Sequence, residues 1–313
     1  MEYRQMGNTG VRVSAVGLGT NQFGGKVDQQ GVNDIIAAAI DLGINLIDTA
    51  DVYQGGRSEE ALGIALQGRW NQVVLATKVH GAMGDGPNDY GTSRYHITAG
   101  IEASLGRLNT DHIDLYQVHR WDDKTPIEET LRALDDLITS GKVRYIGASN
   151  FAAWQLAHSN LLAETRGWTR FATIQNHYHM VERTIEHEVL PYCRAQKVGI
   201  LPYFPLAGGF LTGKYRRGEG APAGSRGESS PYVQRYMTDD NYTRVEHLSA
   251  WAEERGRTMA ELAHAWLLGH PEVCSVISGA TRVTQIEQNA ASAAWHLSSQ
   301  DMAEIEALLA LGG

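Results

Sequence analysis

A closed (β/α)8 TIM barrel is the fold that the sequence predicts, on three observations. Eight short β-branched or apolar runs recur along the 313 residues, and stretches with helical periodicity lie between them. Strands that alternate with helices at roughly thirty-residue intervals are typical of repeated βαβ units and an all-parallel sheet. An apolar content of 42% can fill one large core, so we expect a single domain over residues 1–313.

The predicted elements follow one another from the N-terminus. Residues 1–13 hold two short extended runs around Gly7-Asn8-Thr9-Gly10, which predicts a hairpin that precedes the barrel and plugs its bottom. The eight barrel strands are predicted at residues 16–18, 46–48, 73–77, 113–117, 143–147, 172–176, 199–203 and 274–278. Helices are predicted between them, and two show a regular apolar stripe: Ile97, Ile101, Leu105 and Leu108, and Ile127, Leu131, Leu134 and Ile138.

The interval between the last two predicted strands is the longest in the chain. Its stretch 216–227 is rich in glycine and proline and too long for an ordinary connection, so we expect a mobile loop over the mouth of the barrel. The alternative is a surface insertion without a role, and whether residues 216–232 form a lid stays open. Beyond the eighth strand, residues 299–309 are predicted to form a last helix.

Composition and charge exclude several classes of protein. A net charge of −9 argues against a nucleic-acid partner, which would call for clustered Lys and Arg. No apolar run approaches a membrane span or the core of a signal peptide, so we expect a cytoplasmic protein with no membrane partner. Cys193 and Cys274 fall in predicted helix and strand interiors, as expected of buried free thiols in a reducing compartment. The oligomeric state cannot be read from the sequence.

Four chemically active side chains lie at or just beyond the ends of predicted strands. They are Asp48, Tyr53, Lys78 and His119. The carboxyl ends of the strands of a β/α barrel all meet at one mouth, so residues far apart in sequence converge there. The pattern therefore predicts one site that holds a carboxylate, a phenol, an ammonium and an imidazole.

Each of these four groups has a separate role in reducing a carbonyl. Tyr53 would protonate the oxygen, but a phenol with a pKa of about 10 is a reluctant donor at neutral pH. We expect Lys78 to make this phenol more acidic by stabilising the phenolate, and Asp48 to keep the buried lysine charged. A neutral His119 would donate a hydrogen bond to the carbonyl oxygen and orient the substrate.

Five segments resemble the signature of the aldo-keto reductase superfamily. They are NLIDTADVY (45–53), GGRSEEALG (55–63), ATKV (76–79), DLYQVH (114–119) and VRYIGASNF (143–151). The resemblance runs from the N-terminal hairpin to Asn289, nearly the whole chain. It implies an NAD(P)H-dependent carbonyl reductase with Asp48, Tyr53, Lys78 and His119 as its catalytic tetrad, in agreement with the chemical argument.

The sequence contains no Rossmann fingerprint for the cofactor. The segment 17–22 lacks the last glycine of that motif, and 208–215 meets the P-loop spacing only until Tyr215, where magnesium would need a small hydroxyl. This second segment follows the seventh strand, where barrels of this class commonly bind phosphate. We therefore predict a pyrophosphate clasp formed by Pro205, Leu206, Ala207, Gly208 and Lys214.

The resemblance implies the rest of the cofactor site. Ser149, Asn150 and Gln175 match groups that hold the nicotinamide amide, and Tyr203 matches the ring that stacks on the nicotinamide. Segment 277–289 resembles the adenosine end, where Arg282 at a helix start would suit a 2′-phosphate, so NADPH is preferred to NADH. The remaining implied cofactor residues are Gly19, Thr20, Asn21, Asp48, Leu211, Gly279, Thr281, Gln285, Gln288 and Asn289.

The chain departs from the family pattern at three positions of the cofactor site. Ser278 stands where proline is frequent, Phe204 where serine is frequent, and Gln288 where a glutamate commonly contacts adenine. These departures bear on the adenine contacts and not on the chemistry. The predicted substrate residues are Phe23, Tyr53, His119 and Trp121, but the identity of the aldehyde or ketone, and the physiological direction, cannot be read from the sequence.

Three rival functions were weighed. His177 and His179 lie two apart in an extended segment and could bind a metal in a barrel hydrolase, although no matching ligand set occurs at other strand ends. A Schiff-base lyase would need a neutral Lys78, which pairing with Asp48 opposes. A third alternative keeps the fold and the cofactor without appreciable turnover, since some relatives of the family are regulatory subunits that bind NADPH and partner proteins. We expect no metal ion in the site.

Overall fold

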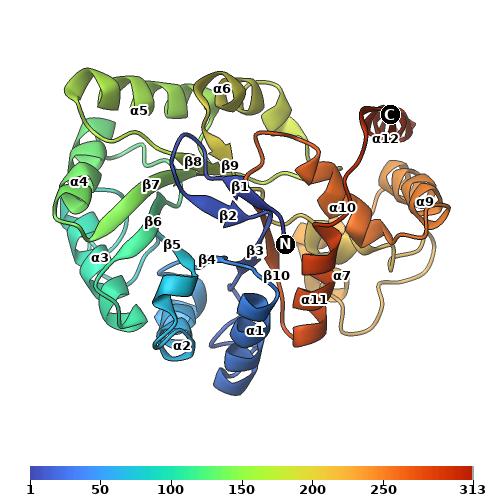
Figure 1. The fold of residues 1–313 in the computed structure, drawn as a ribbon, viewed down its shortest axis with the longest axis horizontal. Helices are drawn as coiled ribbons and strands as arrows, with labels where there is room; N and C mark the ends of the chain where they lie inside the picture. The colour runs from blue at the N-terminus through green and yellow to red at the C-terminus, as the bar shows by residue number, and fades with distance from the viewer. Residues whose placement is uncertain (312–313) are drawn as a thin grey trace.

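The computed structural model describes residues 1–311 and is built around eight parallel strands that curl into a barrel, with helices outside (Figure 1). In spatial order these strands are β10 (Val276–Gly279), β3 (Val16–Gly19), β4 (Leu46–Asp48), β5 (Val74–Val79), β6 (Ile113–Val118), β7 (Val143–Ser149), β8 (Thr173–Gln175) and β9 (Gly199–Ile200). Parallel bridges from Ile200 to Val273 and from Tyr203 to Ile277 join the two ends and close the ring. The predicted (β/α)8 fold is confirmed.

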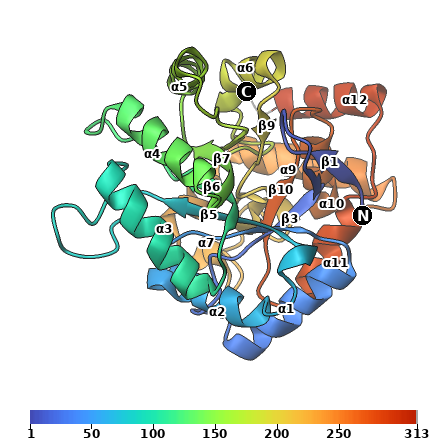
Figure 2. The ribbon, with the colours of Figure 1, turned by 60° about the vertical axis from the view of Figure 1, so that its left-hand side comes forward.

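One helix follows each strand from β3 to β8, in chain order around the barrel. These helices are α1 (Gln29–Asp41), α2 (Arg57–Ala65), α3 (Arg94–Leu108), α4 (Ile127–Thr139), α5 (Ala153–Arg166) and α6 (Val189–Gln196), with the short helices η1 (Tyr53–Gly56), η2 (Trp70–Gln72) and η3 (Thr184–Glu186) between them. After β10 come α11 (Val283–Ser292) and α12 (Ser299–Ala310), the last helix that the sequence predicts at 299–309. Helix α12 packs against α9 on one side of the molecule (Figure 2).

Helix α3 shows why the periodicity predicted helices correctly. The hydroxyl of Ser93 accepts a hydrogen bond from the backbone N–H of His96, which caps the first turn, and Asn109 ends the helix in the left-handed conformation. The predicted stripe is the buried face: Ile97, Ile101, Leu105 and Leu108 all lie in the core. Capping sets where the helix begins and ends, and the stripe sets which face contacts the sheet.

The long segment between β9 and β10 is partly helical. It contains η4 (Ala207–Thr212), α7 (Arg226–Ser229), α8 (Pro231–Gln234), α9 (Asp239–Glu253) and α10 (Met259–Leu268). The irregular stretch ends at 225, so α7 begins inside the region for which the sequence analysis predicted only loop. A high content of glycine and proline predicts loop, so short helices that are stabilised by tertiary contacts are not recognised from the sequence.

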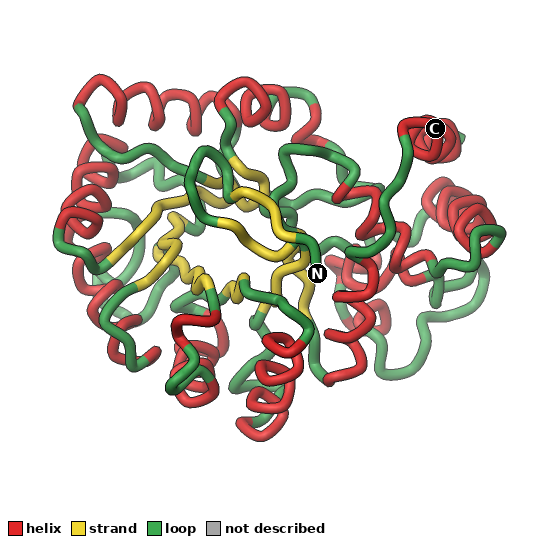
Figure 3. The backbone as a smooth tube through the Cα atoms, in the orientation of Figure 1, coloured by secondary structure: helices red, strands yellow, loops and turns green. Residues whose placement is uncertain are grey.

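The N-terminal hairpin lies across one end of the barrel, as predicted (Figure 3). Its strands β1 (Tyr3–Gln5) and β2 (Arg12–Ser14) pair antiparallel. Between them, Gly7 has a φ of 57°, and a Cβ there would come within 2.2 Å of the backbone oxygen of Ala172 and 2.8 Å of the backbone nitrogen of Gly199. The hairpin therefore packs backbone against backbone on the amino ends of β8 and β9.

Replacing Gly7 by alanine is expected to lower the free energy of unfolding by about 2–3 kcal/mol, because the new methyl group overpacks a backbone contact and the left-handed φ penalises a Cβ. Gly10→Ala is the matched control in the same turn: no atom lies within 4 Å of its added Cβ, and its φ is not left-handed. Urea titrations of the two variants would measure the difference. Equal stabilities would show that the hairpin does not seal the barrel in solution.

The end of β9 and the start of β10 differ from the prediction. Regular pairing of β9 covers Gly199–Ile200 only, with an isolated bridge at Tyr203, because Pro202 interrupts the ladder. Cys274 precedes β10 instead of lying inside it, whereas Cys193 is in α6 as predicted; both are buried free thiols. No helix within residues 1–311 combines the length and the apolar character needed to traverse a membrane.

Candidate active site

Three adjacent strands carry the side chains that the sequence analysis assigned to one site. Asp48 is the last residue of β4, Lys78 lies on β5, and His119 follows β6 directly. Tyr53 opens η1, five residues beyond Asp48. Because neighbouring parallel strands end at the same edge, these residues lie at one mouth of the barrel.

A tight turn returns Tyr53 towards the strand that precedes it. Its backbone N–H donates to the carbonyl of Ala50 (3.1 Å). The next two residues, Gln54 and Gly55, have φ values of 54° and 66° and turn the chain into α2. The Gln54 side chain donates to the backbone oxygen of Asn21 (2.8 Å), which fixes this turn to the loop after β3.

The ammonium of Lys78 is the centre of the cluster. Its Nζ donates to Asp48 Oδ2 (2.7 Å), to the backbone oxygen of Thr49 (2.7 Å) and to Tyr53 Oη (3.3 Å). The side chain of Lys78 is fully buried and that of Asp48 is 2% exposed. Three acceptors satisfy the three hydrogens of the ammonium, so its charge is buried at an acceptable cost.

The second oxygen of Asp48 is also saturated. Oδ1 accepts from Gln175 Nε2 on β8 (2.8 Å) and from Gln117 Nε2 on β6 (3.1 Å). The sequence analysis assigned Gln175 to the nicotinamide and did not name Gln117. A fully buried glutamine inside the apolar strand β6 is the signal that could have identified it.

The ionisation of this pair differs in one respect from expectation. Burial alone would lower the pKa of Lys78, but its contacts with Asp48 and Tyr53 prevail and raise it, so the amine stays charged. For Tyr53, burial outweighs the opposing effect of Lys78, and the pKa of the phenol rises above its ordinary value. The effect of Lys78 on the phenol thus has the expected sign but does not produce a net acidification, and the phenol keeps its proton at neutral pH.

His119 is held neutral beside the phenol. Burial, together with the nearby charge of Lys78, lowers the pKa of His119 to about 3. Its ring centroid lies 6.0 Å from that of Tyr53, in an edge-to-face arrangement. Its backbone is anchored on both sides: the N–H donates to Val79 (2.9 Å), and the carbonyl accepts from Asn150 Nδ2 (3.0 Å).

The residues assigned to the nicotinamide are joined to one another. Ser149 Oγ donates to the backbone oxygen of Gln175 (2.8 Å), and Asn150 Nδ2 donates to Ser149 Oγ (3.0 Å). Tyr203 Oη donates to Asn150 Oδ1 (2.8 Å). A continuous polar chain thus runs from β7 across β8 to the end of β9, beside the tetrad.

The predicted clasp after β9 has an unusual backbone. Ala207, Gly208 and Gly209 have consecutive φ values of 48°, 68° and 102°. Consecutive left-handed residues curve the chain into a concave segment of the kind that surrounds anions. A Cβ on Gly209 would lie 3.1 Å from Lys214 Nζ, so this ammonium is next to the curve, and no ion pair is formed by Lys214 within residues 1–311. Pro205, Leu206 and Leu211 lie in the same segment, with Leu211 fully buried.

Helix α11 begins at the segment assigned to the adenosine end. Arg282 is its N-cap residue and is exposed, while Thr281 donates through its backbone N–H to Gln285 (2.8 Å). Gly279 and Gln288 are exposed, and Asn289 is 7% exposed. Ser278, which departs from the family pattern, is bonded to His264 Nε2 on α10 (2.5 Å), so a buried hydrogen-bond pair occupies this position.

Two other groups of predicted site residues are placed differently. In the segment Gly19, Thr20 and Asn21, the Thr20 hydroxyl donates to the backbone oxygen of Asp48 (2.9 Å) and is buried. The ring of Phe23 is also fully buried in the core, so in this conformation it offers no surface to a substrate. Trp121 packs edge-on against Phe151, with ring centroids 5.3 Å apart.

An aromatic cluster at the mouth includes two residues that the sequence analysis did not name, Tyr232 and Tyr236. His177 stacks on Tyr203 with ring centroids 5.3 Å apart, and Tyr232 and Tyr236, from the segment after η4, lie within 3.2 Å of nitrogens of the same imidazole. His177 also lies 3.0 Å from His179, measured between their Nε2 atoms. No set of three or more His, Cys, Asp and Glu in the described part of the chain is arranged to hold a metal ion. Helix α8 and the residues after it, up to Tyr236, are therefore packed onto the mouth through Tyr232 and Tyr236.

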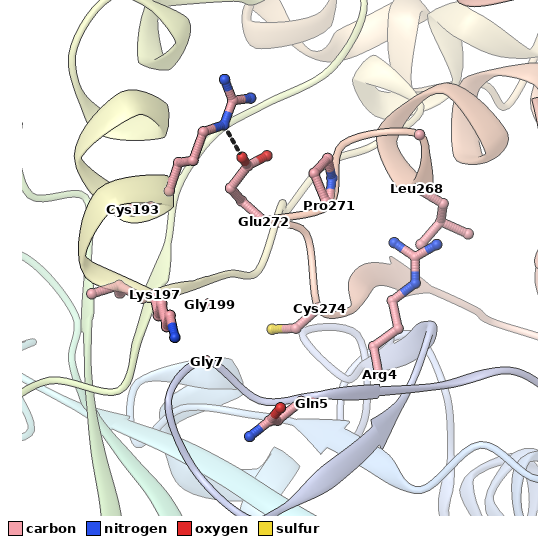
Figure 4. A pocket seen from close by; sticks show the side chains of 13 residues that line it. Arg4, Gln5, Gly7, Cys193, Lys197, Gly199, Leu268, Pro271, Glu272 and Cys274 are labelled. Carbon is pink, nitrogen blue, oxygen red and sulfur yellow. Dashed lines mark hydrogen bonds and ion pairs between the residues drawn. The ribbon is translucent and has the colours of Figure 1, made fainter. Parts of the chain in front are cut away.

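A cavity of about 730 Å³ lies at the opposite end of the barrel and is unrelated to the tetrad (Figure 4). It is bounded by the hairpin, the end of α6 and the chain that enters β10, including Arg4, Cys193, Lys197, Glu272 and Cys274. Burial raises the pKa of Cys274 to about 12 and that of Cys193 further, so neither thiol is reactive at neutral pH.

Comparison with known proteins agrees with this geometry. The family model described as "Aldo/keto reductase family" matches residues 15–310. An uncharacterized oxidoreductase YrpG of Bacillus subtilis is 39% identical over 91% of this chain and 89% of its own length. Aldo-keto reductase YhdN of the same species is 36% identical over 99% and 94%, and a probable voltage-gated potassium channel subunit beta of Arabidopsis thaliana is 38% identical over 92% and 90%.

Proposed function

The chain belongs to the aldo/keto reductase family of NAD(P)H-dependent oxidoreductases, and from this premise we propose that it reduces an aldehyde or ketone to an alcohol with NADPH, with Tyr53 as the proton donor. One observation carries the proposal: a buried, charged Lys78 is bonded both to Asp48 and to the hydroxyl of Tyr53. A phenol that is hydrogen-bonded to a buried ammonium can act as a general acid, because the ammonium stabilises the phenolate that remains after proton transfer.

The groups at the mouth fit a nicotinamide dinucleotide. The left-handed run Ala207–Gly208–Gly209 and the adjacent Lys214 suit a pyrophosphate. The hydrogens of Ser149 Oγ and Asn150 Nδ2 are already engaged, so Ser149 Oγ and Asn150 Oδ1 would serve as acceptors for the N–H groups of the nicotinamide carboxamide. The side-chain nitrogen of Gln175 already donates to Asp48. Gln175 would therefore contact the carboxamide through its remaining amide hydrogen or its amide oxygen.

When bound, the cofactor would supply a hydride to the carbonyl carbon. The side chains of the tetrad would supply the proton and stabilise the charge that develops. As negative charge develops on the carbonyl oxygen, Tyr53 gives it the hydroxyl proton, because an alkoxide is a stronger base than a phenolate. Lys78 stabilises the phenolate that remains, and Asp48 keeps Lys78 charged. Neutral His119 donates an N–H to the carbonyl oxygen and accepts no proton, which agrees with its lowered pKa.

A steady-state assay tests this function. Purified protein would be mixed with NADPH and a panel of simple aldehydes and ketones, and the loss of NADPH absorbance would be followed. Saturable turnover of at least one compound class is the expected result. The rival function, a regulatory subunit that binds NADPH, is favoured by the potassium-channel subunit name of one relative. Tight NADPH binding without turnover across the panel would favour that rival.

Arg282 tests the preference for the phosphorylated cofactor. Arg282→Ala should raise the dissociation constant of NADPH by about 10- to 100-fold, as expected for loss of a charge-assisted contact, and leave that of NADH nearly unchanged. Arg282 is exposed at the start of α11 and forms no ion pair within the described residues, so its removal should not affect folding. Fluorescence titration of both nucleotides measures the effect, and equal losses for both would exclude a 2′-phosphate contact.

A further inference from the structure

Asp51 is a buried carboxyl next to the tetrad that the proposed chemistry does not use. Its side chain is 2% exposed. The backbone N–H of Asp51 donates to the carbonyl of Lys78 (3.3 Å), and Oδ1 accepts from the N–H of Val52 (2.7 Å). The other oxygen, Oδ2, has no hydrogen-bond partner among the described residues. A carboxylate left half-satisfied in an apolar interior is costly, whereas the neutral acid is tolerated.

Charged and titratable groups from five neighbouring elements surround this carboxyl. Glu59 on α2 is fully buried, accepts from the hydroxyl of Thr77 (2.5 Å) and pairs with Arg107 on α3 (2.7 Å). Lys78 on β5 and the phenols of Tyr53 on η1 and Tyr116 on β6 complete the set. The hydroxyl of Tyr116 is itself buried without a partner. Burial, reinforced by Glu59, raises the pKa of Asp51 to about 7 although Arg107 and Lys78 oppose the rise.

The charge of Asp51 adds to the forces on the proton donor. Burial is the largest cause of the raised pKa of Tyr53, and negative charge at Asp51 makes a smaller contribution in the same direction, that is, it disfavours the phenolate that must form when the proton is delivered. Lys78 has one carboxylate within ion-pair distance, Asp48, so a second ionised acid would weaken the stabilisation that Lys78 gives to the phenolate. The number of ionised acids around Lys78 therefore sets how readily Tyr53 gives up its proton.

We propose that Asp51 is a positioning residue of the reduction, which holds a proton of its own and, when neutral, leaves the charge of Lys78 free to assist Tyr53. This proposal rests on the proposed function of the tetrad. It identifies Asp51, a residue outside the tetrad, as the origin of a decline in reduction above neutral pH. Its backbone bond to Lys78 and its place two residues before Tyr53 link it to both partners.

Asp51→Asn provides the first test. At saturating NADPH and carbonyl substrate, the wild-type kcat should fall on the order of fivefold as pH rises through 7, a size expected for one added charge at a distance of several ångströms. Asp51→Asn carries the amide in place of the neutral acid and should show no fall over that range. Asp51→Ser, also uncharged, should behave likewise if the asparagine variant does not fold.

Glu60→Gln is the matched control, because Glu60 is exposed on α2 and its loss changes the net charge by the same amount. Its pH profile should match that of the wild type. A wild-type inflection that persists in Asp51→Asn and Asp51→Ser would overturn the proposal. So would a loss of kcat that is equal at every pH, since that would indicate a structural role alone.

Stability against pH gives an independent readout that needs no turnover. The folded-state pKa of about 7 lies above the unfolded value of about 3.9, so the folded state binds the proton more tightly between these limits. Stability from this group is therefore present at low pH and lost as pH rises to about 7. Asp51→Asn should unfold at the same temperature as the wild type at pH about 4 and at a higher temperature at pH about 8.

The two readouts separate the possible failures. If the wild type turns over no carbonyl compound, the proposed function fails, and the role of Asp51 in it fails too, while the unfolding temperatures still report whether Asp51 carries a proton. If turnover is found but the unfolding temperatures of Asp51→Asn and the wild type differ equally at both pH values, Asp51 does not titrate in this range and the inference is wrong.

Discussion

Replacing Tyr53 by phenylalanine is expected to lower kcat for carbonyl reduction by about 10²- to 10⁴-fold, the usual contribution of a positioned general acid. The ring stays in place because its packing next to His119 and Lys78 does not depend on the hydroxyl. What disappears is the one hydroxyl that is hydrogen-bonded to the buried ammonium within residues 1–311. Stopped-flow measurement of a single turnover would isolate the chemical step from product release.

Cofactor binding should survive this change, with a dissociation constant for NADPH within about threefold of the wild-type value. The proposed role of the Tyr53 hydroxyl is a contact with the substrate carbonyl and not with NADPH, so its loss should change the free energy of NADPH binding little. Tyr95→Phe removes the hydroxyl of an exposed tyrosine on α3 and serves as the matched control, with unchanged kcat expected. A Tyr53→Phe variant that retained most of its turnover would show that the proton comes from another group.

The second large effect is expected from Lys78→Met, which removes one partner of a fully buried ion pair. Breaking such a pair leaves Asp48 as an uncompensated charge and should cost about 3–5 kcal/mol of unfolding free energy. Turnover should fall as strongly as in Tyr53→Phe, since the phenolate loses its stabilising charge. Urea unfolding and single-turnover kinetics measure the two losses separately.

A double variant separates stability from catalysis. In Lys78→Met with Asp48→Asn, neither member of the pair is charged, so most of the lost stability should return, while turnover should stay low. Recovery of both properties would mean that Lys78 served only to compensate a buried carboxylate. Recovery of neither would mean that the cost lies in packing and not in charge.

The sequence predicted the fold well because the signals for a barrel are local. The stripe Ile97, Ile101, Leu105 and Leu108 is visible in the sequence and became the buried face of α3. The early end of β9 follows from Pro202, a signal that is visible in the sequence, whereas the helices α7 and α8 depend on contacts with distant parts of the chain. Periodicity cannot show such contacts, so the edges of these elements were misplaced.

For the site, strand ends predicted which residues meet but not how they share protons. The Asp48–Lys78–Tyr53 chain could be expected from residue types alone. The net rise in the pKa of Tyr53 could not, because it depends on how completely the surrounding structure removes water from the phenol. The role of Asp51 could not be predicted from the sequence either. Asp51 is part of the motif at 45–53, but its separate role rests on its burial and on a side-chain oxygen that has no partner among the described residues.

The three hydrogen bonds that hold the carboxylate of Asp48 have a mechanical consequence. Through its two oxygens this carboxylate contacts side chains of β5, β6 and β8, while its own backbone lies in β4. Any rotation of the Asp48 side chain would break three hydrogen bonds at once. The carboxylate is therefore held in one position and does not carry protons between groups. The contribution of Asp48 to the electric field at Tyr53 is thus fixed when the protein folds, and a reacting carbonyl would meet it without any rearrangement of this acid.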